Sequence, residues 1–495
     1  NGDAPPGIYA TGNKFYNNIV TNCASFDGTY GYGCLNIGGQ DGMLIYNNTI
    51  TTTGATPGWP IKLWNDGYLN GCKIYNNTLK RPPFPYQYNG IGNYFDFCIE
   101  FFNQQGLEIY NNTIEGSIDL NYQTKGPYAY SAYIHDNVIG RSTQAAHCET
   151  GIWLEFQTED CIIENNTFKN ISQPIMFSLR PGSFMNNITI QKNLAYNIGK
   201  TDGTKEGTAI GIIMNDNSTN YSATNWNVYN NTFLALRGNN APYFGINIPG
   251  GNSSTNIKLI NNIITDFDYF SLTCDYGSHV NGLQIKNNTK YNNGSNNNVQ
   301  FTNGTPTNYT YTGNLNTNPN LDVNHIPLPG SPCIDAGINV GLPFSGAAPE
   351  IGVFELGLTN IPPTANAGSD QAITLPTNSV TLIGSGNDTD GFISTYKWTK
   401  ISGPAAGTIT NSNNDTTTVT GLVQGVYKFE LRVTDNNGAS ARDTMQVTVN
   451  PDPNIAPTAN AGPDQTIVLP TNSITLTGSG NDTDGFISTY KWTKI

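Results

Sequence analysis

The chain has 495 residues, of which 12% are charged, and its formal net charge at pH 7 is −13. So small a share of charged residues excludes a long helical or coiled-coil protein, which would be rich in Glu, Lys and Arg. The surplus of acidic residues argues against nucleic acid as a partner, because phosphates need a basic face. The 53 Gly and 28 Pro are only modestly above ordinary usage, so a collagen-like or low-complexity polymer is excluded as well.

No apolar run is long enough to cross a bilayer, so no membrane-spanning segment is expected. The chain opens at Asn1 without a Met or a charged-then-apolar leader, which indicates a processed product or a fragment. Cys23 lies close to Cys34 in the sequence, and Cys148 lies close to Cys161. Each pair is either a disulfide of an exported protein or two buried free thiols.

A short phrase recurs between Asn18 and Asn288 with a mean period of about 30 residues. It consists of an apolar residue, an outward residue and Asn-Asn, usually followed by Thr and another apolar residue. The clearest copies occupy residues 46–50, 75–79, 110–114, 164–168 and 229–233. The period is that of a solenoid in which each repeat forms one coil.

The chemistry of the phrase explains why it repeats. Asn tolerates the left-handed backbone conformation that a tight turn requires. Its amide both donates and accepts hydrogen bonds, so Asn residues on successive coils can form a ladder. The phrase therefore predicts short parallel strands that are joined by Asn-rich turns and stacked coil upon coil. The Asn-x-Thr triplets also match a glycosylation acceptor, but their regular placement favours the ladder.

With these repeats, residues 1–357 resemble a right-handed parallel β-helix of the pectate-lyase-like class. The segments 331–337 (Ser-Pro-Cys-Ile-Asp-Ala-Gly) and 350–355 (Glu-Ile-Gly-Val-Phe-Glu) resemble the closing signature of such helices in secreted bacterial surface proteins. The resemblance implies an N-terminal cap upstream of Asn1.

A second repeat follows the first. Residues 363–401 and 457–495 are identical at 34 of 39 aligned positions. The unit resembles a PKD domain, an immunoglobulin-like module, in the segments 365–368, 388–391, 396–398 and 433–438. We therefore expect a PKD-like sandwich over 358–450 and a truncated second copy over 451–495, with the parent protein continuing beyond Ile495. The predicted fold class is all-β, a parallel β-helix followed by immunoglobulin-like sandwiches.

Two columns of side chains are expected to point outward from the strand that precedes each Asn phrase, because strand side chains alternate between faces. The first column is Lys62, Glu100, Asp119, Trp153, Met176, Gly211, Gly245 and Ser271. The second column is Trp64, Phe102, Asn121, Glu155, Ser178, Ile213, Asn247 and Thr273, with Arg180 just beyond it.

The charged and aromatic members of these columns suit a sugar, so the glycan-binding candidates are Lys62, Trp64, Glu100, Phe102, Asp119, Trp153, Glu155 and Arg180. Two alternatives remain. An ordinary solvated face would carry similar residues. In a catalytic version, Glu100 and Asp119 lie on adjacent coils near the spacing of a retaining glycosidase pair, about 5 Å, or Lys62 or Arg180 abstracts a proton from a uronic acid, as in lyases that the fold resembles.

Metal sites are expected only in the PKD-like units. His135, His147, His279 and His325 are scattered, so zinc is not expected. Calcium is the expected cofactor, because oxygen ligands alternate before a Gly in residues 387–391 and again in 481–485. The proposed ligands are Asn387, Asp388, Asp390, Asp435, Asp482 and Asp484. An Asx-turn without an ion is the alternative.

These features predict an extracellular protein of a bacterial surface, with a β-helix head on a stalk of PKD repeats. It would act as an adhesin or as a subunit of a fibre, with glycans or other protein chains as partners. The alternative is a secreted polysaccharide lyase or glycoside hydrolase with accessory PKD domains. Resemblance alone implies secretion by the type IX route.

Overall fold

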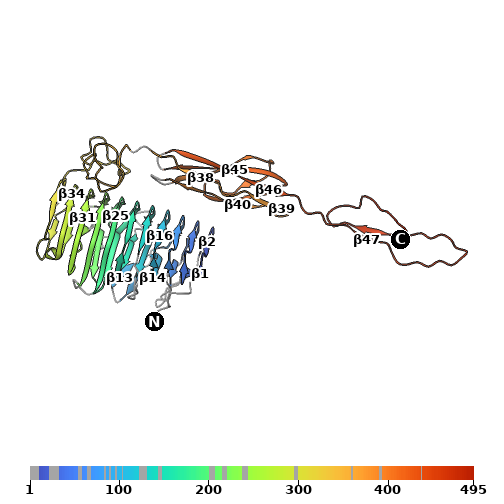
Figure 1. Cartoon of the computed structure of the whole chain (residues 1–495), viewed down its shortest axis with the longest axis horizontal. Coiled ribbons are helices and arrows are strands. Elements are labelled where there is room, and N and C mark those ends of the chain that lie inside the picture. The colour runs from blue at the N-terminus through green and yellow to red at the C-terminus, as the bar shows by residue number, and fades with distance from the viewer. Residues whose placement is uncertain are drawn as a thin grey trace. The chain divides into compact units, whose positions relative to one another are not determined.

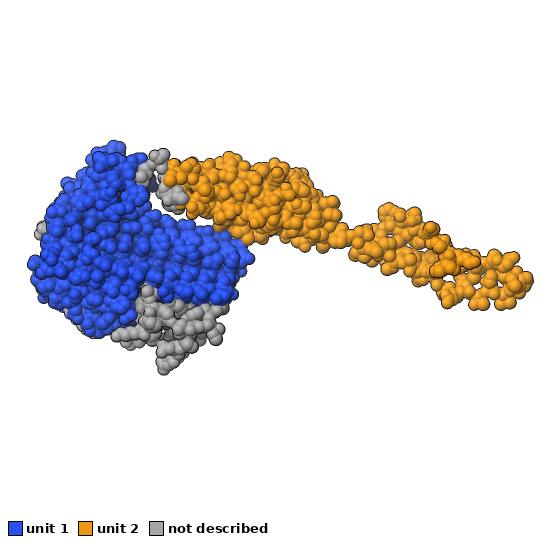
Figure 2. Space-filling model, viewed as in Figure 1, with its two compact units in different colours: residues 1–358 blue, residues 359–495 orange. Residues whose placement is uncertain are grey.

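The computed structural model divides into two compact units, Asn1–Leu358 and Thr359–Ile495 (Figure 2). The residues that it describes are 10–21, 33–53, 58–63, 69–82, 85–88, 91–94, 97–102, 104–121, 131–142, 148–199, 207–214, 220–236, 244–294, 299–357, 360–388, 393–435 and 438–495. In these residues the regular structure is almost entirely β-strand, so the predicted all-β fold class is confirmed.

The first unit is a parallel β-helix, in which each coil places its strands beside those of the next coil (Figure 1). The first row of strands runs the length of the unit. It comprises β2 (Lys14–Tyr16), β6 (Leu44–Tyr46), β10 (Lys73–Tyr75), β16 (Leu107–Tyr110), β19 (Ala132–His135), β23 (Cys161–Glu164), β25 (Ser183–Gln191), β28 (Tyr221–Tyr229), β31 (Ser253–Ile260), β34 (Val280–Lys286) and β37 (Thr310–Thr312), with β22 (Gln157–Glu159) beside β25.

A second row follows each Asn turn. It comprises β3 (Ile19–Thr21), β7 (Thr49–Thr51), β11 (Thr78–Lys80), β17 (Thr113–Glu115), β20 (Val138–Gly140), β24 (Thr167–Leu179), β26 (Leu194–Ile198), β29 (Thr232–Ala235), β32 (Ile263–Thr265) and β35 (Thr289–Tyr291).

A third row carries the two predicted outward columns. It comprises β4 (Gly33–Ile37), β8 (Trp59–Leu63), β14 (Phe97–Phe102), β18 (Ser117–Asn121), β21 (Cys148–Glu155), the second half of β24, β27 (Thr208–Met214), β30 (Phe244–Asn247), β33 (Phe270–Cys274) and β36 (Val299–Phe301). Shorter elements are β1 (Ala10–Thr11), β5 (Gln40–Asp41), β9 (Leu69–Asn70), β15 (Gln104–Gln105), the hairpin β12 (Pro85–Tyr88) and β13 (Ile91–Tyr94), and the 3-10 turn η2 (Gly277–His279).

The two Asn residues of each turn have different structural roles. The first position adopts left-handed φ angles, such as +55° at Asn47 and +54° at Asn111. The second Asn is buried, and its Nδ2 donates to the Oδ1 of the equivalent Asn on the next coil, as from Asn112 to Asn137 at 2.9 Å. The predicted ladder is thus confirmed. Its rungs are Asn18, Asn48, Asn77, Asn112, Asn137, Asn166, Asn193, Asn231, Asn262, Asn288 and Asn314.

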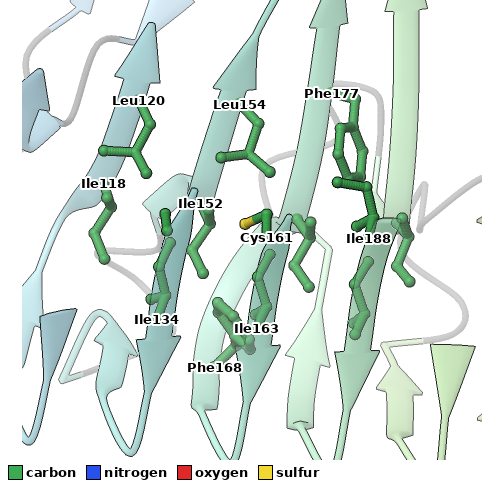
Figure 3. Close-up of a cluster of buried hydrophobic side chains, with 14 of the residues drawn as sticks. Ile118, Leu120, Ile134, Ile152, Leu154, Cys161, Ile163, Phe168, Phe177 and Ile188 are labelled. Atoms are coloured by element: carbon green, nitrogen blue, oxygen red, sulfur yellow. The ribbon is translucent and has the colours of Figure 1, made fainter. Parts of the chain in front are cut away.

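Stacked aliphatic side chains fill the interior of the β-helix. Figure 3 shows Ile118 and Leu120 of β18 beside Ile152 and Leu154 of β21, all turned toward the same interior. The four side chains are at most 3% exposed. Burying each contributes about 1.5–3 kcal/mol. Since neighbours along a strand alternate between faces, Asp119 between Ile118 and Leu120 points the opposite way.

The segment after β37 packs back on the β-helix. Cys333 and Ile351 are fully buried against Ile263 of β32. Asn261 donates from its Nδ2 to the carbonyl of Ile338 at 2.8 Å, and its Oδ1 accepts from the Ile338 amide at 2.9 Å. The closing signature therefore lies on the turns of the later coils.

The second unit contains an immunoglobulin-like sandwich. One sheet has the strand order β39 (Gln371–Thr374), β46 (Ser440–Asn450), β45 (Gly425–Asp435), β42 (Ile393–Ser402). The other has β40 (Val380–Ile383), β44 (Thr416–Thr420), β43 (Thr408–Ile409), and β38 (Thr364–Asn366) pairs with β41 (Ser385–Asn387). Trp398 is 1% exposed between the sheets, and the Tyr427 hydroxyl donates to the Val423 carbonyl at 3.0 Å. A tyrosine bonded back to a nearby backbone is typical of this fold.

The second repeat forms only β47 (Thr458–Asn460) and β48 (Ser479–Asn481), which pair as β38 and β41 do. In the first repeat, β39 pairs with β46, β40 pairs with β44 and β42 pairs with β45. The partner strands β44, β45 and β46 all lie in residues 416–450. The 495 residues contain no second copy of that stretch. Nearly identical sequence therefore forms fewer strands where its pairing partners are missing.

Candidate functional site

The predicted first column has the expected register over most of its length. Glu100 of β14 lies beside Lys62 of β8 on one side and Asp119 of β18 on the other. The column continues from Asp119 to Trp153, then to Met176 and Gly211. Since strands in a sheet lie about 4.8 Å apart, these side chains are direct neighbours.

The expected exposure of this column is wrong for its first three members and also for Met176, Gly211, Gly245 and Ser271, which are buried. Lys62 is 6% exposed, Glu100 is 8% exposed and Asp119 is 2% exposed. Part of the cover comes from the same sheet, because the Lys62 Nζ lies 4.0 Å from the centre of the buried Trp59 ring. The Arg81 guanidinium lies 4.9 Å from the same ring centre. These residues form a buried charged cluster instead of an open face.

The cluster is organised around one ion pair. The Lys62 Nζ donates to the Glu100 Oε2 at 2.5 Å. Burial raises the pKa of Glu100, and the charges of Lys62 and Arg81 oppose that rise. Burial also raises the pKa of Asp119 well above its usual range, and the carboxylates of Glu155 and Glu100 raise it further. Asp119 Oδ1 is buried and has no hydrogen-bond partner among the residues that the structure describes.

Of the other glycan-binding candidates, Trp153 lies beside Asp119 in the sheet, and Glu155 is close enough to affect the pKa of Asp119. Trp153 is half-buried, and its Nε1 donates to the Oε1 of Glu155 at 2.7 Å. Arg180 is exposed, and its guanidinium stacks 3.7 Å from the centre of the Phe156 ring. Trp64 and the side chain of Phe102 lie outside the described residues. Glycan binding by all these residues stays a prediction.

A groove of about 280 Å³ lies further along the third row. It is lined by Ile212, Ile213, Met214, Tyr221, Asn247, Ile248, Thr273, Asp275 and Tyr276. Glu155 pairs with Ser178, and Ser178 pairs with Ile213, so the second predicted column leads into the groove. Sequence reasoning passed over it because Ile213, Asn247 and Thr273 are uncharged. The Asp275-Tyr276 pair directly after β33 was the available signal.

The groove combines fixed polar groups with apolar surface. The Thr273 hydroxyl donates to the Oδ1 of Asn247 at 2.9 Å, which leaves the Asn247 amide nitrogen as a donor. Tyr276 stacks on His279 with ring centres 5.6 Å apart. Ile213 is 46% exposed at the other side of the lining. Polar groups of Asn247, Thr273 and Asp275 therefore lie beside apolar side chains in one groove.

Two of the expected calcium ligands, Asp435 and Asp484, accept hydrogen bonds from other protein groups. Asp435 is buried; its Oδ1 accepts from the Ala439 amide at 2.8 Å and its Oδ2 from the Asn360 amide group at 2.9 Å. Asp484 accepts from the Ile455 amide at 2.8 Å. Among the described residues no three His, Cys, Asp or Glu side chains converge to hold a metal ion. Asp390 lies outside those residues, so calcium binding stays a prediction.

Calcium binding at this loop would raise the thermal unfolding midpoint of the PKD-like unit. A ligand at 100 times its Kd stabilises the folded state by about 2.7 kcal/mol. We expect scanning calorimetry in millimolar calcium to show the rise, EDTA to reverse it and Asp388→Ala to abolish it. A midpoint that calcium leaves unchanged would exclude a calcium site there.

The cysteines also divide into two kinds. Cys34 is disulfide-bonded, and Cys23, the partner that the sequence suggests, lies outside the described residues. Cys161 is a free buried thiol whose pKa burial raises to about 12. The predicted alternative of a Cys148–Cys161 disulfide is therefore wrong, since the Cys161 side chain belongs to the core of the β-helix.

In the described residues, no helix has the length and apolar character needed to cross a membrane.

Comparison with known proteins finds similarity to PKD domains. Residues 367–449 and 461–495 match a family of PKD domains described as like that of the KIAA0319-like protein. The chain is 42% identical over 133 residues to the human "Dyslexia-associated protein KIAA0319", a match that covers 27% of this chain and 12% of that protein. It is 37% identical over 93 residues to the mouse "Low-density lipoprotein receptor-related protein 11", covering 19% of each.

A solved structure, "Solution structure of the PKD domain from KIAA 1837 protein", is 34% identical, covers 22% of this chain and all of that one, and has a TM-score of 0.18. The chain spans only about an eighth of the length of KIAA0319, so the activity of that whole protein does not transfer with the match.

These relatives correct the function expected from the sequence. The prediction of a secreted bacterial adhesin or fibre subunit with type IX export, or of a polysaccharide-degrading enzyme, is contradicted because the relatives are mammalian proteins and one is named as receptor-related. The prediction was wrong because it inferred a bacterial source and an activity from resemblance in fold. Proteins of one fold can differ in function, because function resides in their sites. A receptor-related relative is consistent with an extracellular or surface position.

Proposed function

We propose that this protein is an extracellular, receptor-like recognition protein whose β-helix binds a carbohydrate in the groove over β27, β30 and β33. The observation that carries the proposal is the lining of that groove. Asn247, Thr273 and Asp275 offer donors and acceptors beside apolar surface from Ile213 and Tyr276. A sugar ring has the matching mixture of hydroxyl groups and apolar C–H faces.

Each polar group has a defined part in this binding mode. The Asp275 carboxylate accepts hydrogen bonds from sugar hydroxyls, and the Asn247 amide nitrogen donates one. The hydrogen bond from Thr273 to Asn247 fixes the orientation of the amide before the ligand arrives. Such preorganisation lowers the entropy that binding would otherwise cost. Ile213 and Tyr276 cover the apolar face of the ring.

The second column suggests how a longer glycan would run. Glu155 lies two coils before Ile213 in the same column, with Ser178 between them. Coils repeat about every 4.8 Å, and Ser178 is buried, so a longer glycan would contact Glu155 and the groove on either side of that coil. Trp153 and Glu155, which are bonded to each other, would then extend the site beyond the groove.

An extracellular position is supported by two observations. Cys34 is disulfide-bonded, and disulfides persist in oxidising compartments. A relative of the PKD-like region is named as a receptor-related protein. We include secretion or surface display in the proposal on these grounds.

Affinity electrophoresis of the full chain through gels that contain neutral or acidic polysaccharides tests the binding site. We expect retention by at least one polysaccharide, and a loss of affinity of about tenfold or more in Asn247→Ala with Asp275→Ala, since hydrogen bonds to charged groups contribute about 1.5–3 kcal/mol.

Lys258→Ala is the matched control, because Lys258 lies on β31 of the first row, away from the groove lining, and should migrate like the unchanged protein. Absence of retention by every polysaccharide would contradict carbohydrate binding. Retention that survives the double substitution would contradict this groove as its site.

A further inference from the structure

The buried charged cluster of Lys62, Glu100 and Asp119 has no part in the proposed carbohydrate groove. These residues lie on three adjacent strands, β8, β14 and β18, and face the same side of the sheet. An amine, a carboxyl group that touches it and a second carboxyl group beside the first are the groups that an amide-forming condensation needs. We propose that Lys62 and Glu100 condense to an isopeptide bond that covalently joins two successive coils of the β-helix.

The geometry brings the reacting groups together. The Lys62 Nζ lies 2.5 Å from the Glu100 Oε2, so the amine already contacts the carboxyl group that it would attack. The side chains are only 7% and 11% exposed, and the Trp59 ring covers the amine at 4.0 Å. Reactants held in contact behave as if at very high concentration. Burial also excludes the water that would reverse the reaction.

The first step is a proton transfer within the pair. The Lys62 ammonium gives its proton to the Glu100 carboxylate, which leaves a neutral amine and a neutral carboxylic acid. Burial disfavours separated charges, and it raises the pKa of Glu100 despite the opposing charges of Lys62 and Arg81. The neutral pair is the reactive form, because the amine needs its lone pair and a carboxylic acid is the better electrophile.

The second step forms the amide. The Nζ lone pair attacks the Glu100 Cδ, and the tetrahedral intermediate loses one carboxyl oxygen as water. The balance is R–NH2 + HOOC–R′ → R–NH–CO–R′ + H2O, so no oxidant or further reactant is required. One proton moves from Nζ to the departing hydroxyl group.

Asp119 is placed to move that proton. Its carboxyl group is buried, which raises its pKa, and the carboxylates of Glu155 and Glu100 raise it further, so its environment favours the protonated acid. Its Oδ1 has no hydrogen-bond partner among the described residues. Asp119 lies beside Glu100 in the sheet, so the acid can donate to the Glu100 carbonyl oxygen, which makes the carbon more electrophilic, and can then pass a proton to the leaving group.

The same β-helix contains two ion pairs that serve as internal controls. Lys73 lies 2.5 Å from Glu108, and Lys80 lies 2.9 Å from Glu115. The lysine side chains are 46% and 44% exposed, so water stabilises their charges. Although burial alone would raise the pKa of Glu108, hydrogen bonds from Lys73 and His135 lower it. Glu108 therefore stays a carboxylate, which resists attack, and neither control pair should condense.

Intact-mass spectrometry of the purified full chain, after reduction and prolonged incubation at neutral pH, tests the bond. We expect a mass lower than the sequence mass by one water, about 18 Da. Tandem spectrometry of a protease digest should map this loss to a branched peptide that joins residues 62 and 100. Lys62→Arg should restore the full mass, whereas Lys73→Arg should retain the loss.

The Asp119→Asn variant tests the role of the acid while both partners of the bond, Lys62 and Glu100, are kept. We expect the cross-linked fraction of this variant to fall at least tenfold at equal incubation time. An unchanged protein that keeps its full sequence mass overturns the proposal without requiring any variant to fold. A loss of water that maps elsewhere also overturns it. Full cross-linking in Asp119→Asn would retain the bond and overturn the role of Asp119.

Discussion

Replacing Asn112 by Ala should destabilise the β-helix by about 3 kcal/mol or more, because several buried polar groups lose their partners at once. The Asn112 Nδ2 donates to the carbonyls of Ile74 and Tyr110 and to the Oδ1 of Asn137, each at 2.9 Å. Its Oδ1 accepts from both the backbone N and the Nδ2 of Asn77 at 2.9 Å. Ala satisfies none of these groups, and each buried orphan costs about 1–3 kcal/mol.

The neighbouring residue provides a matched control. Asn111 is exposed and has a φ of +54°, a conformation that Gly adopts without strain. Asn111→Gly should therefore change stability by no more than about 0.5 kcal/mol. Urea unfolding followed by circular dichroism compares the two variants. If Asn112→Ala lowers the free energy of unfolding no more than Asn111→Gly does, the Asn ladder is present in the fold but does not stabilise it.

The Asn phrase explains why so much of the fold could be predicted. It recurs once per coil, so it fixes the row of turns and, through the alternation of strand side chains, the inward and outward positions. The register from Lys62 through Glu100 to Asp119 follows from it and is confirmed. One register prediction is wrong: Ile210 pairs with Ile246, which places Gly211 opposite Asn247 instead of Gly245. Both Gly211 and Gly245 lie between apolar neighbours, so the pattern alone did not distinguish the two registers, whereas the pairing of the buried Ile210 and Ile246 does.

Burial at the candidate site could not be predicted in the same way. The alternation of side chains along a strand predicts which face of the sheet a side chain points from. It does not predict whether another part of the chain covers that face. Glu100 and Asp119 do point outward from the sheet, yet they are only 8% and 2% exposed. Trp59 lies three residues before Lys62, and nothing in the repeat pattern marks its ring as cover for the amine. The groove was missed for a different reason, since the residues that the repeat places there, Ile213, Asn247 and Thr273, are uncharged.

Lys290 should make the stability of the β-helix depend on pH between about 8 and 10.5. It occupies a core position, because its neighbour in the second row is the fully buried Ile264. Its side chain is 0% exposed, and burial lowers its pKa from 10.5 to about 8. The Nζ donates to the Tyr311 hydroxyl, which is its polar contact at the end of the stacked core.

The direction of this pH dependence follows from how strongly each state binds the proton. Between the folded pKa and the unfolded pKa, the unfolded chain binds the proton more strongly, so stability rises as pH increases through this window. Below about pH 8 the ammonium is buried in the folded state, at a cost of about 3 kcal/mol by the size of the shift. Lys290→Met should therefore be more stable than the unchanged protein at pH 7, by up to about 3 kcal/mol. The difference should shrink steadily toward pH 10.

Urea unfolding of both proteins from pH 6 to pH 10 measures this difference directly. Burial raises the pKa of Tyr311 as well, so its phenol could contribute a slope of its own at high pH. Repeating the comparison in the Tyr311→Phe background removes that contribution while keeping the lysine. A Lys290→Met advantage that stays constant with pH would mean that the substitution acts by packing alone. An advantage that grows with pH would contradict the direction of the shift and place a charged lysine in the folded core.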